Sequence, residues 1–498
     1  MQQKKDILGK IFFTLSILFL GYTLITPLNH LVCQIDEYFT MTITNLPVQD
    51  IITVTAGDVH PPLYYMMAKV VVEISKTFNL NVLFNLKLLT ISAFVLILII
   101  SATEIRKEYG WLTAGLFAFS LSVMSEFSRY HLIARMYSWT ILFILIAFLA
   151  FRNIINNKDV KKSWLILTLF SVIAAYTHYF GAITAICIYL ALLIYLINKR
   201  KDQLKNWIMS AVAGSVLYLP WVFVLIGQLM EIKKGYIYSP ITFEDLIIFL
   251  GYYAYNETVI FAVISIVFLI AITAIYLKES DSFSKGDKIL FLTAVGAYFG
   301  TIFIAVFVSQ LLNPILDGRY LMPAAALLWL AISIILSKIK NKRLFLIDLC
   351  LITILLVSGV AYAVMTFDNN YHQGQLEKEY FDNISQDNNS IWIIATENDL
   401  MFFLCCSKGV DTYCINVSDV FSLPSEELHR QYNYTDINET QIDEFISNNT
   451  DKNIYLMYWN HTSVKSPIES EFTYLLMHYT KINTTNISSV SPKYVRLN

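Results

Sequence analysis

Acidic and imidazole side chains stand together in two short stretches of an otherwise strongly apolar sequence. The stretch QIDEYFT contains Asp36 and Glu37, and GDVHPPLYY contains Asp58 and His60. Asp58 and His60 are two residues apart, so they project on the same side of an extended chain, and the proline after His60 favours an extended backbone there. Two acids and an imidazole could move a proton or supply ligands to a metal ion. Taken alone, QIDEYFT is also typical of solvated acids near the end of a span, and GDVHPPLYY is more typical of a loop turn with a helix N-cap.

Arginine and histidine side chains recur in a third stretch, SEFSRYHLIARMYS, at residues 125–138. If this stretch is helical, the spacing places Ser128, His131, Arg135 and Ser138 on one stripe. The guanidinium groups of Arg129 and Arg135 suit a phosphate, because they offer several N–H donors in a fixed plane. The alternative is an interaction of the two arginines with lipid headgroups at the membrane surface.

Two further stretches carry the same residue types. YTHYFG contains His178, and LDGRYLMPA contains Asp317, Arg319 and Tyr320. An aromatic belt at a membrane surface explains the tyrosines but not the histidine. We therefore expect separate loops to bring carboxylates, imidazoles and guanidinium groups to one face of a membrane.

The elements that must position these residues are predicted to be membrane-spanning helices. The chain has 498 residues, of which 56% are hydrophobic and 15% are charged, against about 25% charged in soluble proteins. The formal net charge of −2 excludes a polybasic nucleic-acid binder. A re-entrant turn around residues 252–256 is an alternative within the region 246–277. The apolar blocks predict about eleven spans, which lie near 11–28, 85–103, 112–128, 137–151, 164–180, 182–197, 207–226, 257–277, 289–311, 321–337 and 344–365.

The basic residues predict how these spans are oriented. Lys and Arg gather in the loops on one side, so the N-terminus is expected in the cytoplasm. The segment PPLYYMMAKVVVEISKTF is then a surface helix, because counting it as a span would move the basic loops outside. Residues 29–84 become an outer loop, and an odd number of spans places residues 366–498 outside the cytoplasm.

Two domains are predicted from the change in composition. Residues 1–365 form the transmembrane catalytic domain, and residues 366–498 form a small extracytoplasmic α/β domain. In the latter, β-branched and aromatic residues predict strands at SIWIIAT, DTYCIN and NIYLMYW. Helical patterns lie between or after them, at ENDLMFFLCCSKG, TQIDEFISN and ESEFTYLLMHY.

The stretches DEYFT, DVHPPLYY, RYHLIARMYS, THYFG and GRYLMPA, in this order, resemble membrane glycosyltransferases of the C-type superfold that use polyprenyl-phosphate sugars. The branch that includes protein mannosyltransferases and lipid A aminoarabinose transferases is the most similar. The resemblance covers about residues 10–340. It implies inverting transfer of a hexose or pentose from the lipid donor to a protein, lipid or polysaccharide acceptor at the outer face of the cell membrane.

The resemblance also implies roles for individual residues. Asp36 is expected to act as or near the general base, with Asp58 as the alternative, and Glu37 and His60 complete the catalytic set. Residues expected to bind the donor phosphate are Arg129, Arg135, Tyr137, Arg319 and Tyr320, and His131 and His178 are additional candidates.

Two alternatives remain beside this prediction. Asp36, Asp58, His60 and His178 have the donor atoms for a divalent metal ion, although their spacing matches no metal signature. A transporter or flippase of a lipid-linked sugar or polysaccharide is the alternative function. Transporters commonly carry internal repeats and ionisable groups at the membrane midplane, and the sequence contains neither pattern.

Overall fold

The computed structural model divides by internal contacts into two units. The first comprises Met1–Asn29 and Val59–Thr366, and the second comprises His30–Asp58 and Phe367–Asn498. The structure describes residues 2–26, 28, 34–235, 241–254, 258–312, 314–386, 389–394, 411–415, 431, 434–437, 442–458 and 493–496.

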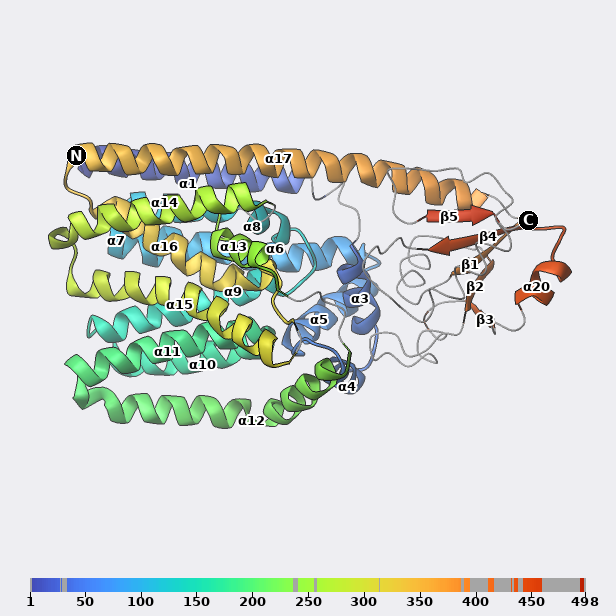
Figure 1. The fold of residues 1–498 in the computed structure, drawn as a ribbon, viewed down its shortest axis with the longest axis horizontal. Helices are drawn as coiled ribbons and strands as arrows, with labels where there is room; N and C mark the ends of the chain where they lie inside the picture. The colour runs from blue at the N-terminus through green and yellow to red at the C-terminus, as the bar shows by residue number, and fades with distance from the viewer. Residues whose placement is uncertain are drawn as a thin grey trace. The chain divides into compact units, whose positions relative to one another are not determined.

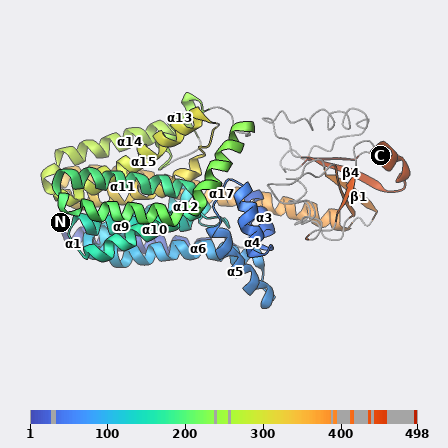
Figure 2. The ribbon, with the colours of Figure 1, turned by 90° about the horizontal axis from the view of Figure 1, so that it is seen from below.

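The first unit is a bundle of long helices that lie side by side (Figures 1 and 2). Most of them are apolar on every face, which is typical of helices surrounded by lipid and by one another. In chain order they are α1 (Gln2–Ile25), α5 (Leu63–Thr77), α6 (Val82–Ile100), α7 (Arg106–Val123), α8 (Ser125–Tyr130), α9 (Tyr137–Ile155), α10 (Val160–Thr177), α11 (Tyr179–Lys199), α12 (Leu204–Gly235), α13 (Phe243–Gly251), α14 (Val259–Lys278), α15 (Lys285–Leu311), α16 (Met322–Lys338) and α17 (Lys342–Gln386).

Ten helical segments are long and apolar enough to cross a membrane among the residues that the structure describes. One of them, Val82–Val123, has 42 residues, about twice the length that one crossing needs. It is interrupted at Gly110, where a φ of +84° breaks the helix, and it contains two of the predicted spans. Each predicted span therefore has a helical counterpart, and the predicted polytopic helical fold is confirmed.

Small residues allow α1 and α7 to pack closely. A Cβ atom at Gly9 would lie 2.1 Å from the backbone of Trp111, and one at Gly115 would lie 1.9 Å from the carbonyl oxygen of Gly9. Both distances are far below van der Waals contact. Without a side chain at these two positions the backbones come together, which is a common way for helices to associate in lipid.

The basic loops converge at one end of this bundle. The Lys5 ammonium group donates hydrogen bonds to the Ser337 and Ile339 carbonyl oxygens, at 2.7 and 2.8 Å. Lys158 pairs with a carboxylate oxygen of Glu108 at 2.6 Å. These contacts join the start of α1, the start of α7, the loop before α10 and the end of α16. The grouping of basic loops that the sequence predicts is thus present in the first unit.

Two local predictions have different outcomes. The segment after Pro62 forms α5, whose 15 residues are not among the candidate spans, as predicted. The helical stripe considered for residues 125–138 does not form, because α8 ends at Tyr130 and the helix resumes only at Tyr137. At the expected re-entrant turn, the short helix α13 ends at Gly251 and α14 begins at Val259, with residues 255–257 outside the described residues.

The described residues of the second unit form short helices, the part of α17 after Thr366, and a sheet. Two of the short helices are α3 (Ile35–Thr44) and α4 (Val48–Gly57). The sheet has the order β3-β2-β1-β4-β5, in which β1 to β4 are parallel and β5 is antiparallel to β4. Its elements are β1 (Ser390–Ile394), β2 (Asp411–Ile415), β3 (Thr435–Ile437), α20 (Ile442–Asn448), β4 (Asn453–Tyr458) and β5 (Lys493–Arg496).

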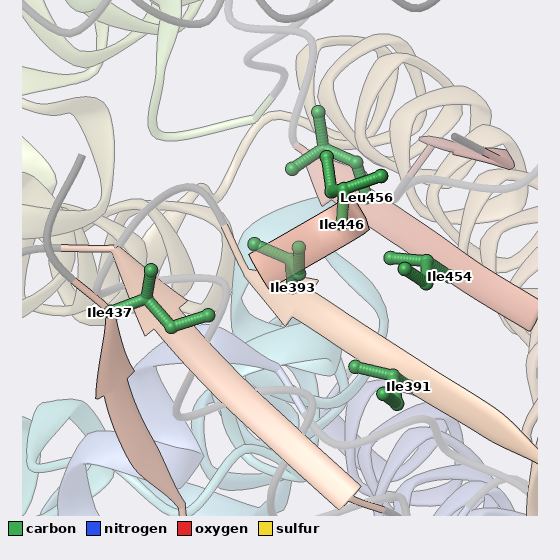
Figure 3. Packing of buried hydrophobic residues seen from close by; sticks show 6 residues of the cluster. All are labelled: Ile391, Ile393, Ile437, Ile446, Ile454 and Leu456. Carbon is green, nitrogen blue, oxygen red and sulfur yellow. The ribbon is translucent and has the colours of Figure 1, made fainter. Parts of the chain in front are cut away.

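Aliphatic side chains from the strands and from α20 form the core of this sheet (Figure 3). The buried residues are Ile391, Ile393, Ile437, Ile446, Ile454 and Leu456. The three predicted strands and the helix at TQIDEFISN are confirmed, and they form the largely parallel sheet expected of a small α/β domain. The other two predicted helices lie outside the described residues.

Candidate active site

His60, Tyr65 and Arg135 are positioned by the chain reversals at one end of the helix bundle. His60 precedes two prolines, and Pro62 forms the N-cap of α5, so Tyr65 lies on the first turn of that helix. Arg135 belongs to the short irregular stretch between α8 and α9. The prolines fix the backbone where α5 begins, which gives His60 and Tyr65 a defined spacing.

Arg135 connects the side chains of His60 and Tyr65. One guanidinium nitrogen donates a hydrogen bond to the Tyr65 hydroxyl group at 2.9 Å, and the other donates to His60 Nε2 at 3.3 Å. The guanidinium also lies 5.8 Å from the centre of the Tyr65 ring. Because His60 Nε2 accepts a hydrogen bond, its proton resides on Nδ1 and the imidazole is neutral. All three side chains are buried, so the positive charge of Arg135 is held rigidly and away from bulk water.

His178 occupies the junction between α10 and α11. Its Nδ1 accepts a hydrogen bond at 3.1 Å from the Phe180 backbone N–H and thereby caps α11. The ring proton is therefore on Nε2, which has no hydrogen-bond partner among the described residues. Burial, and then the nearby His60, Arg135 and Arg319, hold the pKa of His178 well below its ordinary value of 6.5. The imidazole is consequently neutral at physiological pH.

Aromatic rings connect His178 to the other predicted phosphate-binding residues. The His178 ring centre lies 5.7 Å from that of His60, 5.6 Å from Tyr137 and 4.8 Å from Tyr320. The Arg319 guanidinium lies 5.6 Å from the Tyr320 ring and 3.2 Å from an Asp317 carboxylate oxygen. The cluster formed by His60, Tyr65, Arg135, Tyr137, His178, Arg319 and Tyr320 is called the polar cluster below.

An apolar cavity of about 590 Å³ opens beside the polar cluster. His60, His178 and Tyr320 line it together with side chains of α10, α11, α12 and α15. From His178 to Thr168, which also lines the cavity, the helical rise gives a length of about 15 Å. Pro220 lies inside α12, whose ribbon bends in Figure 1. This arrangement can hold an amphiphile whose chain lies among the helices and whose polar group meets the imidazoles.

His131 is not part of the polar cluster. Its Nε2 donates to the Leu121 carbonyl oxygen at 3.0 Å, and its Nδ1 accepts from the Ser138 hydroxyl group at 2.8 Å. The ring also stacks on Phe94, with ring centres 4.0 Å apart. Burial lowers the pKa of His131 to about 3. Both nitrogens are used within the protein, which indicates a structural role.

Arg129 lies at the margin of the polar cluster. Its guanidinium is 5.4 Å from the centre of the Tyr130 ring, and Tyr130 packs edge-on against Tyr137 with ring centres 4.8 Å apart. Arg135 contacts His60 directly, whereas Arg129 reaches the cluster only through an aromatic ring. Arg135 therefore has the more direct contact with the polar cluster.

The three predicted catalytic acids belong to the second unit. Asp36 lies in the first turn of α3 and is partly buried, and Asp58 forms the C-cap of α4 with an extended backbone. Glu37 is buried and accepts a hydrogen bond from the Gln34 backbone N–H at 3.0 Å in a capping box. This contact is a helix-capping role for Glu37. That Asp36 and Asp58 share a site with the polar cluster stays a prediction.

A divalent metal ion is commonly held by several His, Cys, Asp or Glu side chains. Among the described residues, no group of three or more such side chains is placed to hold one. His60 Nε2 and His178 Nδ1 already accept hydrogen bonds, and the Arg135 guanidinium beside His60 would repel a cation.

Tyr65 is the member of the polar cluster that the sequence prediction missed. Its only sequence signal is its place in the first turn after the two prolines of HPPLYY. Two tyrosines stand side by side there, and both are fully buried. Tyr64 bonds to the Thr90 hydroxyl group and Tyr65 bonds to Arg135, a difference that depends on tertiary contacts.

Comparison with solved structures identifies the fold. The chain resembles ArnT from Cupriavidus metallidurans bound to undecaprenyl phosphate, with a TM-score of 0.56, 12% identity, and coverage of 98% of this chain and 97% of that one. It also resembles the apo state of the same protein, with a TM-score of 0.54, 12% identity and 97% coverage of both chains. No family model and no curated protein sequence matches. The predicted resemblance to lipid A aminoarabinose transferases, which are glycosyltransferases of the C-type superfold, is thus confirmed at the level of the fold.

Proposed function

We propose that this protein is an inverting glycosyltransferase that moves a sugar from a polyprenyl-phosphate donor to an acceptor at the outer face of the cell membrane. One observation carries the proposal: the apolar cavity in the first unit is lined by His60, His178 and Tyr320, and Arg135 donates a hydrogen bond to His60. A lipid chain suits the apolar cavity walls, and a phosphate suits the His178 N–H group and the nearby charges of Arg135 and Arg319. The fold is shared with ArnT, whose structure holds undecaprenyl phosphate.

The proposed reaction is a single displacement. A hydroxyl group of the acceptor attacks the anomeric carbon, the new C–O bond forms as the bond to the phosphate oxygen breaks, and the configuration inverts. The electron pair of the broken bond goes to the phosphate, whose growing negative charge Arg135 and Arg319 stabilise in a site shielded from water. The hydroxyl proton goes to a carboxylate, Asp36 in this proposal and Asp58 in the alternative.

The proposed orientation follows the basic loops. Lys5 and Lys158 lie at the basic end of the bundle, which is assigned to the cytoplasm. The polar cluster then lies at the outer face. Residues 366–498 also lie outside, where the small α/β domain binds the acceptor or covers the site. The sugar is a hexose or a pentose, and the acceptor is a protein, a lipid or a polysaccharide.

Release of undecaprenyl phosphate tests the proposal. The purified full chain in lipid nanodiscs is incubated with undecaprenyl-phosphate hexoses and pentoses and with acceptor-containing membrane extract. The wild type is expected to release undecaprenyl phosphate, and Asp36→Asn is expected to slow this by about 10²-fold or more. Asp50→Asn, which changes an exposed acid on α4, is the matched control and should retain activity.

Three outcomes contradict the proposal in different ways. If no donor is consumed by the wild type, the glycosyltransferase assignment fails. If Asp36→Asn and Asp58→Asn are both as active as the wild type, the assignment of the general base fails. If the lipid-linked sugar crosses a sealed membrane intact and no undecaprenyl phosphate appears, the protein is a flippase.

A further inference from the structure

His178 presents one ring nitrogen that the protein uses and one that it does not. Nδ1 accepts the hydrogen bond from the Phe180 backbone N–H. Nε2 therefore carries the proton, is buried, and has no acceptor among the described residues. A buried donor without an acceptor is unfavourable by roughly 1–3 kcal/mol, so such a donor calls for an explanation.

The surroundings of His178 indicate which ligand would supply that acceptor. His178, His60 and Tyr320 all line the cavity, whose other walls are largely apolar side chains of the helices. Arg135 and Arg319 both act electrostatically on His178. A ligand in this place is thus an amphiphile with an anionic, hydrogen-bond-accepting head.

The helix that His178 caps adds to this preference. His178 precedes the first turn of α11, a helix of 21 residues. The partial positive charge at a helix N-terminus favours an anion. The Arg135 and Arg319 side chains contribute positive charges near the same imidazole. The cavity, the N-terminus of α11 and the unsatisfied His178 N–H group therefore all favour an anionic, hydrogen-bond-accepting group.

We propose that His178 Nε2–H donates a hydrogen bond to a phosphate oxygen of the lipid that occupies this cavity. His178 is then a phosphate-binding residue that contacts the lipid directly, while Arg135 supports it from behind His60. The inference rests on the proposed function, since it deepens the account of the donor site. The low pKa of His178 is consistent with a neutral donor that keeps its N–H throughout the physiological pH range.

Two substitutions separate the binding role of His178 from its capping role. In His178→Asn the amide oxygen takes the place of Nδ1, so the cap of α11 is kept and the distal N–H is lost. In His178→Gln the longer amide places an N–H near the position of Nε2, and the cap is lost. A merely structural histidine would tolerate asparagine and suffer from glutamine, whereas a phosphate donor predicts the opposite order for binding.

The experiment measures binding to the purified full chain in nanodiscs, with undecaprenyl phosphate and undecaprenol as probes. For His178→Asn we expect affinity for undecaprenyl phosphate to fall about tenfold or more, with unchanged affinity for undecaprenol and a near-normal unfolding temperature. For His178→Gln we expect a lower unfolding temperature and affinity for undecaprenyl phosphate within a few fold of the wild type.

Different results would contradict the role of His178 and the proposed function. If His178→Asn binds undecaprenyl phosphate as tightly as the wild type, the hydrogen bond is refuted and His178 is only a cap. If the wild type itself does not prefer undecaprenyl phosphate to undecaprenol, the proposed function fails instead. If phosphatidic acid displaces undecaprenyl phosphate at equal concentration, the site binds any lipid phosphate monoester, which overturns the polyprenyl assignment but retains the role of His178.

Discussion

Replacing Tyr65 by phenylalanine tests whether the polar cluster holds Arg135 in place. The substitution removes one hydroxyl group and keeps the aromatic ring that faces the guanidinium. The lost hydrogen bond has a charged donor, so its contribution is about 1.5–3 kcal/mol, against about 0.5–1.5 kcal/mol for a neutral pair. Tyr65 is fully buried, so bulk water does not replace the missing acceptor.

Tyr64→Phe is the matched control for this change. Tyr64 is the preceding residue on α5, is also fully buried, and pairs with the Thr90 hydroxyl group at 3.2 Å. We expect Tyr65→Phe to weaken undecaprenyl phosphate binding about tenfold, which corresponds to about 1.4 kcal/mol. Tyr64→Phe should leave that binding within a few fold of the wild type.

Equilibrium binding in nanodiscs and thermal unfolding of the same samples provide the two readouts. The reasoning requires a loss of binding in Tyr65→Phe that exceeds any loss in Tyr64→Phe. Equal effects of the two substitutions on binding would show that the packing of α5, and not the hydrogen bond from Arg135 to Tyr65, determines the affinity for undecaprenyl phosphate. Unchanged binding in Tyr65→Phe would show that His60 alone positions the guanidinium.

Three further predictions address the cavity, the helix packing and the buried histidine. Gly214→Leu places a side chain in the cavity beside Thr168 and should reduce undecaprenyl phosphate binding at least tenfold. Gly227→Leu, at an open position on the same helix, should not, and equal binding by both variants would contradict a chain-holding cavity. Gly115→Ala should lower the free energy of unfolding by about 1–3 kcal/mol, because the added Cβ meets the α1 backbone. Gly21→Ala, which has open space around it, should leave that free energy unchanged. Similar losses of stability in the two variants would refute the close packing of α1 and α7. The folded state lowers the pKa of His131 from 6.5 to about 3, so the stabilising contribution of the neutral imidazole is complete above pH 6.5 and declines as the pH falls toward 3. The unfolding temperature of His131→Phe should therefore depend less on pH between 6.5 and 3 than that of the wild type. Equal pH dependence of the two unfolding temperatures would contradict the burial of a neutral His131.

The helix bundle was predictable because hydropathy and charge act over whole segments. Twenty apolar residues cannot avoid the membrane at reasonable cost, and every backbone group in lipid must be hydrogen-bonded within a helix. The distribution of basic residues kept the segment after Pro62 out of the span count, and α5 has only 15 residues. Hydropathy separated the spans at 85–103 and 112–128 but did not place the break at Gly110, because a single positive φ leaves no trace in an average over many residues.

The site was predictable as a set of residue types but not as a set of contacts. Arg135, His178 and Tyr320 are identifiable from the sequence because polar groups at membrane level are costly, and the structure brings them together with His60, Tyr137 and Arg319. Their hydrogen bonds join segments far apart in the chain, so sequence spacing could not predict them. The helical stripe through His131 failed because the chain leaves the helix at Tyr130, and His131 bonds to Ser138 across an irregular turn instead.

The hydrogen bond between Arg135 and His60 has a consequence for acid–base chemistry. The Nε2 lone pair of His60 points at a guanidinium 3.3 Å away, so protonation of this imidazole would set two cations against each other. His60 is therefore a poor acceptor for the proton that an attacking hydroxyl group releases. If the protein transfers a sugar, the limb of its rate profile on the acid side should follow a carboxyl group.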